Sequence, residues 1–173
     1  MSTPDGRHRL ARNPAAVLIR PHRIGDMGFV VHRHAVLYHQ DYGFDASFEA
    51  LVAKVAAEFI ESFDPARGCS FIAEIDGRIA GAAFVVAKSV TVAKLRLVYL
   101  EPWARGAGLG RRLVEACMAF ARGAGYTRMT LWTQDFLVPA RKLYASLGFE
   151  RISAEPLQAF GRQMITETWE RDL

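Results

Sequence analysis

The chain has 173 residues, 51% hydrophobic and 23% charged, and this composition is typical of one globular domain. Its formal charge of +4 comes from the start, because Met1–Arg23 holds five of the 22 basic residues and one of the 18 acidic ones, so the remainder carries 17 of each. We therefore expect a flexible basic arm over residues 1–13 and a single domain over residues 14–173, with no nucleic-acid partner. Two cysteines without metal-ligand spacing, no apolar run of membrane-spanning length and no signal peptide favour a cytoplasmic protein without a membrane partner.

The predicted domain begins with one strand and two helices. The apolar run Ala15–Arg20 predicts the strand. Asp26–Tyr38 predicts the first helix. Phe44–Phe63 predicts the second, because its apolar residues recur every three or four positions behind Asp45 or Ser47 as the N-terminal cap.

A hairpin and a third strand follow. Ser70–Ile75 and Ile79–Lys88 are rich in β-branched and aromatic residues, and Asp76-Gly77 between them is a strong hairpin signal. Val92–Leu100 predicts the next strand, which leads into the glycine-rich segment Arg105–Gly110. The expected order at this point is strand, loop and helix.

The last third of the chain predicts two helices and three strands. An apolar stripe from Leu109 predicts a helix that Gly123 and Gly125 end. After a strand at Met129–Thr133, a short helix is expected at Pro139–Leu147, with Gly148 in a left-handed cap. The closing strands are expected at Phe149–Ser153 and Gln163–Trp169.

The glycine-rich segment is a candidate anion site. It opens a helix, where unpaired N–H groups and the positive end of the helix dipole attract anions. A P-loop would need Lys and Ser or Thr after its last glycine, whereas Gly110 is followed by Arg111 and Arg112. A dinucleotide-binding loop would need glycine at position 111. Neither of these two phosphate loops fits.

The segment does match R/Q-x-x-G-x-G/A, with Arg105, Gly108 and Gly110 at the fixed positions, and residues 140–149 match A-x-x-L-Y-x-x-x-G-F. On these two motifs and the element order, the chain resembles the GNAT superfamily of N-acetyltransferases. The resemblance implies an α/β fold, with a mixed, mostly antiparallel sheet of about seven strands, about four helices and a V-shaped cleft between two diverging parallel strands.

Through residues 22–34 and Trp132-Thr133, the chain also resembles the acetyltransferase half of proteins that fuse a MarR-type DNA-binding domain to a GNAT domain. No DNA-binding half is present in this sequence.

The superfamily resemblance implies that acetyl-CoA is the cosubstrate and that a primary amine of a small molecule attacks it directly in a ternary complex. Tyr144 stands where the family places the tyrosine that protonates the departing thiolate. The implied cofactor-binding positions are Val98, Tyr99, Leu100, Arg105, Gly106, Ala107, Gly108, Leu109, Gly110 and Arg111. The alternative is a CoA-binding regulatory module without catalysis, and a homodimer is left open.

Two departures from the family pattern bear on the site. Leu137 replaces a common asparagine that contacts CoA, a contact that Gln134 or Asp135 could replace. Lys94 and Arg96 occupy the region where protein-acetylating members carry a glutamate base. Because side chains alternate along a strand, Lys94 and Arg96 share one face, where they either bind an acidic substrate group or pair with a carboxylate such as Glu74.

The histidines suggest an acceptor site rather than a metal site. His32 and His34 are two residues apart and do not face the same side of a helix, so no metal is expected. His34 and Tyr38 lie one turn apart and are candidates to line the acceptor site, where a neutral histidine can act as a base. Trp103 and Trp132 fit either a binding contact or the core.

Overall fold

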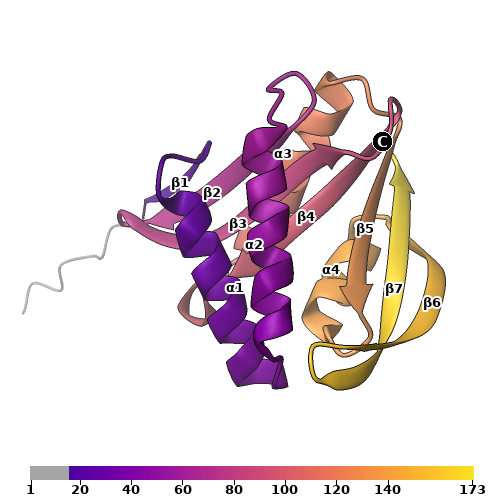
Figure 1. Ribbon diagram of the computed structural model, residues 1–173. Helices are drawn as coiled ribbons and strands as arrows, with labels where there is room; N and C mark the ends of the chain where they lie inside the picture. Colours follow the sequence, from indigo (N-terminus) through magenta and orange to yellow (C-terminus); the bar gives the residue numbers. More distant parts are fainter. Residues whose placement is uncertain (1–15) are drawn as a thin grey trace, which may run out of the picture.

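The computed structural model describes residues 16–173, and the predicted arm at 1–13 lies outside this range. The described chain forms one seven-stranded sheet with four α-helices (Figure 1). None of the helices in residues 16–173 is both long and apolar enough to cross a membrane. The elements in chain order are β1 (Val17–Arg20), α1 (Asp26–Tyr42), α2 (Ala46–Glu61), β2 (Cys69–Ile75), β3 (Arg78–Ala87), β4 (Val92–Leu100), α3 (Leu109–Gly123), β5 (Arg128–Gln134), α4 (Val138–Ser146), β6 (Glu150–Ala159) and β7 (Arg162–Asp172).

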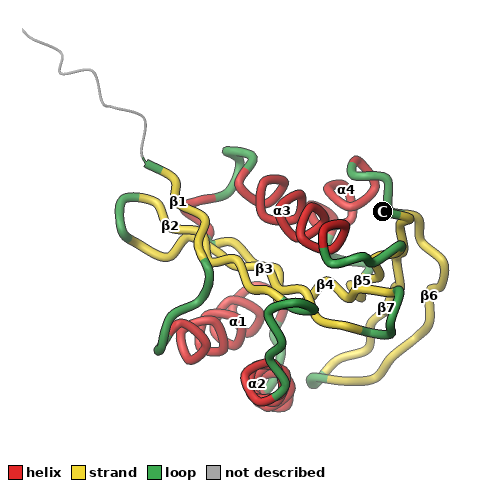
Figure 2. Tube along the Cα trace, turned by 90° about the horizontal axis from the view of Figure 1, so that it is seen from above, coloured by secondary structure: helices red, strands yellow, loops and turns green. Residues whose placement is uncertain are grey.

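The sheet has the spatial order β1-β2-β3-β4-β5-β7-β6, and every neighbouring pair is antiparallel except β4 and β5. Helices α1 and α2 cover one face, and α3 and α4 cover the other (Figure 2). The predicted mixed, mostly antiparallel fold is therefore confirmed.

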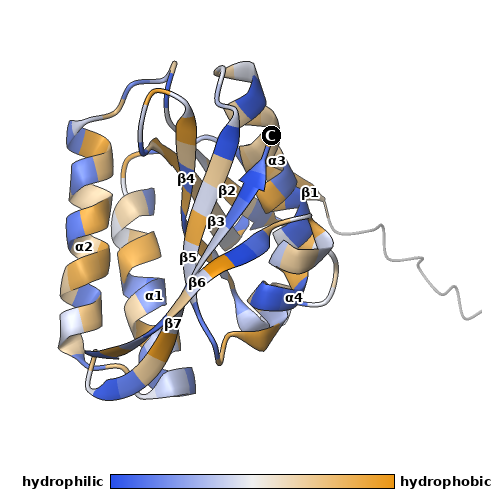
Figure 3. Ribbon diagram, turned by 90° about the vertical axis from the view of Figure 1, so that its right-hand side faces the viewer, coloured by the Kyte–Doolittle hydropathy of each residue, from blue (hydrophilic) through white to orange (hydrophobic). Residues whose placement is uncertain are grey.

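Apolar residues of α1 and α2 are orange in Figure 3, and most of those that are buried face the sheet. Val30 and Leu37 of α1 and Phe59 of α2 pack with β3 and β4 on that face, while Leu113 and Cys117 of α3 pack on the opposite face. Each face of the sheet thus has its own hydrophobic core.

The helix boundaries follow from local chemistry. The side chain of Asp45 accepts a hydrogen bond from the Ser47 N–H at 2.9 Å, which satisfies a free donor at the start of α2 and makes Asp45 the cap. Helix α1 continues past the predicted Tyr38 to Tyr42, because the first residue that adopts the left-handed conformation is Gly43, at φ 72°.

Turn residues explain why one hairpin agrees with the prediction and why the other is longer than predicted. Asp76 and Gly77 both have positive φ, as a two-residue hairpin turn requires, and they join β2 to β3 as predicted. Strands β6 and β7 extend well beyond the predicted residues and meet at Phe160-Gly161, also at positive φ. Phenylalanine is unusual in a turn and proline is unusual in a strand, so neither Phe160 nor Pro156 predicted this longer hairpin. Proline is tolerated here because β6 is an edge strand.

The sheet opens between β4 and β5. Their parallel pairing runs only from Val92 and Arg128 to Leu95 and Leu131, although β4 continues to Leu100 and β5 to Gln134. In Figure 1 the two strands start together and then separate. Beyond Leu95, the backbone groups on this edge of β4 have no strand beside them. The predicted V-shaped opening is present.

A β-bulge shapes the free part of β4. Leu97 has φ 50°, and the pairing with β3 skips one residue between Arg96 and Tyr99. The bulge changes the alternation of side chains: Leu95 and Val98 belong to the α3 face, whereas Leu97 and Tyr99 belong to the α1 and α2 face. Two successive residues, Arg96 and Leu97, therefore lie on the same side.

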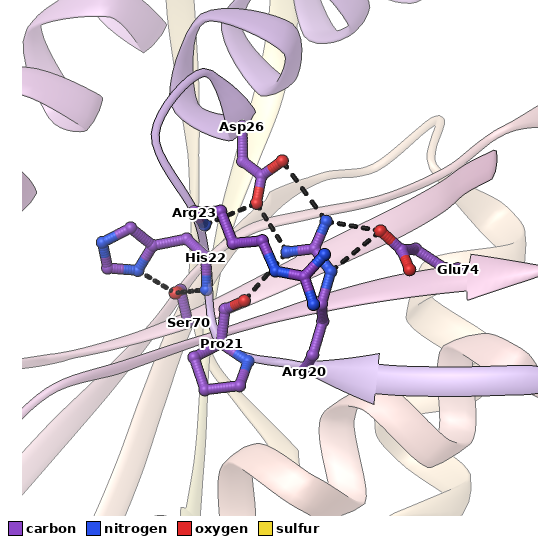
Figure 4. Close-up of polar contacts among 7 residues, drawn as sticks. All are labelled: Arg20, Pro21, His22, Arg23, Asp26, Ser70 and Glu74. Carbon is purple, nitrogen blue, oxygen red and sulfur yellow. Dashed lines mark hydrogen bonds and ion pairs between the residues drawn. The ribbon is translucent and has the colours of Figure 1, made fainter. Parts of the chain in front are cut away.

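A buried ion cluster connects β1, α1 and β2 (Figure 4). The Arg20 guanidinium bonds the Asp26 carboxylate at 2.6 Å and the Glu74 carboxylate at 2.5 Å, and the Arg20 residue is only 8% exposed. Although burial alone would raise the pKa of Asp26, hydrogen bonds from Arg20 and the Arg23 N–H outweigh it and lower that pKa. The cluster fixes the start of α1 against the sheet.

Candidate active site

A cavity of about 430 Å³ lies where β4 and β5 separate. It is bounded by both strands, by α1 and α2 on one face and by α4 on the other. Its lining residues include His34, Tyr38, Phe48, Leu51, Val52, Val55, Lys94, Leu95, Arg96, Leu97, Val98, Leu131, Trp132, Thr133, Gln134, Leu137, Ala140 and Tyr144. The structure therefore brings Tyr144, the two acceptor-site candidates of α1 and the two cations of β4 to one place.

The cavity crosses the sheet and has two chemically different ends. On the α3 and α4 side, Leu95, Val98 and Tyr144 belong to the core that these helices cover. Because side chains alternate along β4, Lys94 and Arg96 lie on the face opposite to Leu95. This is the α1 and α2 side, where apolar residues of α2 also line the cavity. Two molecules approaching from opposite faces of the sheet could therefore meet in the split.

Tyr144 stands on the α3 and α4 side of the split, within reach of the cavity. Its ring is 6% exposed and packs edge-on against Phe149 with 5.9 Å between ring centroids. Burial, with smaller contributions from Tyr38 and Cys117, raises the pKa of the Tyr144 hydroxyl. Among residues 16–173, Tyr99 has the only side-chain hydroxyl that is fully buried and makes no hydrogen bond. The Tyr144 hydroxyl also makes no hydrogen bond within these residues, so it is not fully buried, and Tyr144 lines the cavity. Tyr144 is therefore a buried, protonated phenol on the lining of the cavity.

The glycine segment lies between β4 and α3. Gly106 and Gly108 have φ 83° and 75°, and a Cβ built at either would meet no atom within 4 Å, so the space beside the loop is open. Gly108 precedes α3 without a side-chain cap, and Arg112 is the first residue whose N–H bonds back to the turn, at 3.2 Å to the Gly108 carbonyl. Within the described chain, the N–H groups of residues 106–111 thus have no acceptor and can bind an anion.

Two other predicted cofactor positions, Arg105 and Tyr99, differ in what they expose: Arg105 exposes its side chain, and Tyr99 exposes its backbone. Arg105 is half exposed and lies 3.7 Å from Asp41, and its Nε donates to the Leu100 carbonyl at 3.4 Å. A Cβ at Gly81 would come within 2.5 Å of the Tyr99 carbonyl oxygen, so only glycine fits there. The Tyr99 side chain points to the α1 face and does not line the cavity, which leaves its backbone as the part available at the strand edge.

His34 is a buried, neutral residue of the acceptor side. Burial lowers its pKa to about 4, against the smaller opposing effect of its hydrogen bond to the Val30 carbonyl. Because a carbonyl only accepts, Nδ1 carries the proton in that 2.9 Å bond and Nε2 is left as an acceptor. Tyr38 stacks on His34 with 6.1 Å between ring centroids, and burial raises its pKa.

Lys94 and Arg96 lie on the same face of β4 and line the cavity. Glu74, considered from sequence as their partner, is instead bonded to Arg20 at 2.5 Å. Among the described residues, neither cation forms an ion pair, and the lining of the cavity contains no carboxylate.

The remaining sequence candidates separate clearly. Gln134 is 4% exposed and lines the cavity beside Leu137, whereas Asp135 borders a different cavity near β6 and β7. Trp132 lines the cavity at 40% exposure, but Trp103 lies on the surface under the Arg78 guanidinium. No group of three potential metal ligands occurs in residues 16–173.

Sequence reasoning missed the wall that α2 contributes. Phe48, Leu51, Val52 and Val55 line the cavity, yet their helical spacing is the same as that of residues buried against a sheet. It also missed the bulge at Leu97, since no glycine, asparagine or aspartate marks that left-handed position. Neither feature had a local signal.

Comparison with known proteins gives relatives in sequence and in structure. The family model described as the acetyltransferase (GNAT) family matches residues 34–149. A mycothiol acetyltransferase of Thermomonospora curvata is 34% identical over 93 residues, which are 54% of this chain and 31% of that protein. The N-acetyltransferase C1271.07c of Schizosaccharomyces pombe is 29% identical over 115 residues, which are 65% of this chain and 70% of that one. The chain thus spans less than a third of the first relative and over two thirds of the second.

Solved structures share the whole architecture. The YncA protein of Salmonella typhimurium, determined with its cofactor acetyl-CoA, has a TM-score of 0.68 at 23% identity, over 91% of this chain and 94% of that one. A GNAT-family acetyltransferase of Staphylococcus aureus Mu50 has a TM-score of 0.74 at 14% identity, over 91% and 99%. With the family match covering most of the domain, the two linked motifs and the split sheet, this chain belongs to the GNAT family of acetyltransferases.

Proposed function

We propose that this acetyltransferase uses acetyl-CoA to acetylate the primary amine of a small molecule, by direct attack in a ternary complex. The observation that carries the proposal is the cavity through the β4–β5 split, with Tyr144 on one side and an acceptor-sized space on the other. The cavity measures about 430 Å³, and apolar side chains of α2 form one of its walls, which suits a small acceptor.

The cofactor is proposed to lie along the α3 side of the split. The unpaired N–H groups of residues 106–111 bind the pyrophosphate, and the positive end of α3 adds to this attraction. The backbone of Val98, Tyr99 and Leu100, which has no neighbouring strand on this edge, bonds the pantetheine amides. This arrangement brings the thioester to Tyr144.

The chemistry needs no covalent enzyme intermediate. The neutral amine nitrogen attacks the thioester carbonyl carbon, a C–N bond forms and the C–S bond breaks. The nitrogen releases one proton to solvent, and the thiolate of CoA takes one from the Tyr144 hydroxyl, which solvent then replaces. In this proposal a backbone N–H of β4 beyond Leu95, where no strand pairs on this edge, donates to the oxyanion.

The raised pKa of Tyr144 is compatible with this acid role. The phenol stays protonated through the neutral pH range, and a thiolate formed in the same desolvated site is itself more basic than in water. His34 has a different role in the proposal: with a pKa of about 4 it is too weak a base to hold the amine's proton, but its Nε2 can accept a hydrogen bond and orient the amine.

The relatives support the reaction class more than the acceptor. Two relatives, a mycothiol acetyltransferase and an N-acetylaspartate synthetase, are named for different compounds, and YncA was solved with acetyl-CoA. The small-molecule acceptor, the cytoplasmic location, the absence of nucleic-acid and membrane partners, and the likeness to MarR-fused domains stay predictions.

Acetyl-CoA is expected to raise the melting temperature, because a ligand that binds only the folded state adds about 2.7 kcal/mol at 100 times its Kd. NAD and ATP are expected to produce much smaller shifts, since the loop lacks the features of their sites. Differential scanning fluorimetry with the three ligands measures this. Equal shifts for all three would contradict the cofactor assignment.

Gly108→Asp and Gly108→Asn form a matched pair for the pyrophosphate site. Both side chains tolerate the left-handed conformation and enter the same open space, so both variants should fold, but only aspartate opposes the phosphates with a negative charge. We expect Gly108→Asp to bind CoA at least about tenfold more weakly than Gly108→Asn, as measured by isothermal titration calorimetry at low salt. Equal affinities would place the phosphates elsewhere.

A further inference from the structure

The acceptor side of the cavity holds two positive charges that form no ion pair with any of residues 16–173. Lys94 and Arg96 line it from β4, and Glu74, the carboxylate considered as their partner, is bonded to Arg20. Burial, together with repulsion from Arg96 and Lys88, lowers the pKa of Lys94. A half-buried pair of like charges is costly unless an anion joins it.

Opposite the two cations, the cavity wall is apolar. Helix α2 contributes Phe48, Leu51, Val52 and Val55. Leu51 and Trp132 remain 37% and 40% exposed although they border a cavity, so they offer apolar surface that the protein itself does not cover. Burying such surface against the apolar part of a ligand would favour binding.

The position of Arg96 relates these features to the reaction. It directly follows Leu95, the last residue of β4 that pairs with β5, and so stands at the point where the strands separate. A group bound by Arg96 would therefore lie beside the start of the free edge of β4, along which the thioester is proposed to lie. An amine attached to an anionic group would be held next to the acetyl carbon.

We propose that the acceptor is an α-amino acid with an apolar or aromatic side chain, whose carboxylate binds Arg96 and Lys94 and whose side chain packs against the α2 wall. This inference rests on the proposed acetyl transfer and names the substrate class of that site.

Matched acceptors test the carboxylate. Phenylalanine and leucine are compared with their amides and with the corresponding decarboxylated amines, by release of free thiol from acetyl-CoA. Because the amine of an amino-acid amide is less basic, a larger share of it is neutral at neutral pH, and this favours the amide. A preference for the acid therefore reports recognition of the carboxylate. We expect kcat/KM for the acid to exceed that for either analogue by roughly tenfold or more, as a charge-assisted hydrogen bond contributes.

Variants then assign the recognition to the two side chains. Arg96→Met and Lys94→Met should each raise KM for phenylalanine by about tenfold and leave the kinetics of 2-phenylethylamine within a few-fold. Arg122→Met removes the same charge from the exposed end of α3 and should change neither. Arg96→Glu should reverse the order, so that 2-phenylethylamine becomes the better acceptor.

The outcomes separate the two levels of the proposal. If amides or decarboxylated amines are acetylated as well as the acids, or if none of these compounds is accepted while acetyl-CoA still stabilises the protein, the amino-acid inference is wrong and the acetyl-CoA assignment stands. If acetyl-CoA neither stabilises the protein nor releases thiol with any amine, the proposed function itself is wrong.

Discussion

Tyr144→Phe is expected to reduce kcat by roughly 100-fold or more, the usual contribution of a general acid, with CoA affinity nearly unchanged. The substitution keeps the ring that packs against Phe149 and removes only the hydroxyl, which bonds no residue of the described chain. Kinetics with an identified acceptor and calorimetric titration of CoA, on one preparation, measure both quantities.

A structural role for the Tyr144 hydroxyl would give a different result. A hydroxyl that only stabilised α4 would contribute about 1 kcal/mol, lower the melting temperature slightly and leave kcat within a few-fold. An acyl-CoA analogue with a more acidic thiol leaving group would also restore part of the lost rate if protonation is the missing step. Full turnover by the phenylalanine variant would refute the acid role.

Arg20→Met is expected to lower the free energy of unfolding by about 3 kcal/mol at neutral pH, because it leaves two carboxylates buried without their cation. The side chains of Asp26 and Glu74 are only 10% and 14% exposed, so water cannot replace the guanidinium effectively. Chemical denaturation measures the loss. Arg23→Met, a nearby change at an exposed arginine, should stay within about 0.5 kcal/mol of the unmodified protein.

Acidification provides a second measurement on the same variant. Without Arg20, burial raises the pKa of Asp26 above its ordinary value, so the ionised carboxylate destabilises the fold at neutral pH. Protonation relieves this as the pH falls through the raised pKa towards the ordinary value of about 4. In the unmodified protein the pKa of Asp26 is lowered, so its stabilisation is lost only as the pH falls below about 4 and through the lowered pKa. The difference between the two proteins should therefore narrow in acid; a constant difference would mean that lost packing, and not charge, explains the effect.

Local chemistry made most of the fold predictable. The pair Asp76-Gly77 specified a hairpin, Asp45 a helix cap, and the segment before α3 an unpaired helix start, because in each case the decisive residues are neighbours in sequence. The resemblance carried by two motifs supplied the roles of the loop and of Tyr144, and the structure places Tyr144 at the split. These roles stay predictions until the variants are measured.

Long-range packing set the limit of prediction. The single-residue shift at Leu97 depends on how β4 leaves β5, and the role of α2 as a cavity wall depends on where the sheet opens. Glu74 was considered as a partner for Lys94, but a residue much earlier in the chain, Arg20, takes it. Such competition for a partner cannot be read from spacing along one strand.

The cavity draws its two ends from separate parts of the chain, with α1 and α2 on one side and α4 on the other. A change on the α2 wall, at Leu51 or Val52 for example, therefore need not disturb the anion loop that opens α3. An ancestral protein of this architecture could exchange one acceptor for another through a few replacements in a single early helix. The acceptor could then change while the acetyl-CoA site stays the same. This is consistent with relatives whose names refer to acetylation of different compounds.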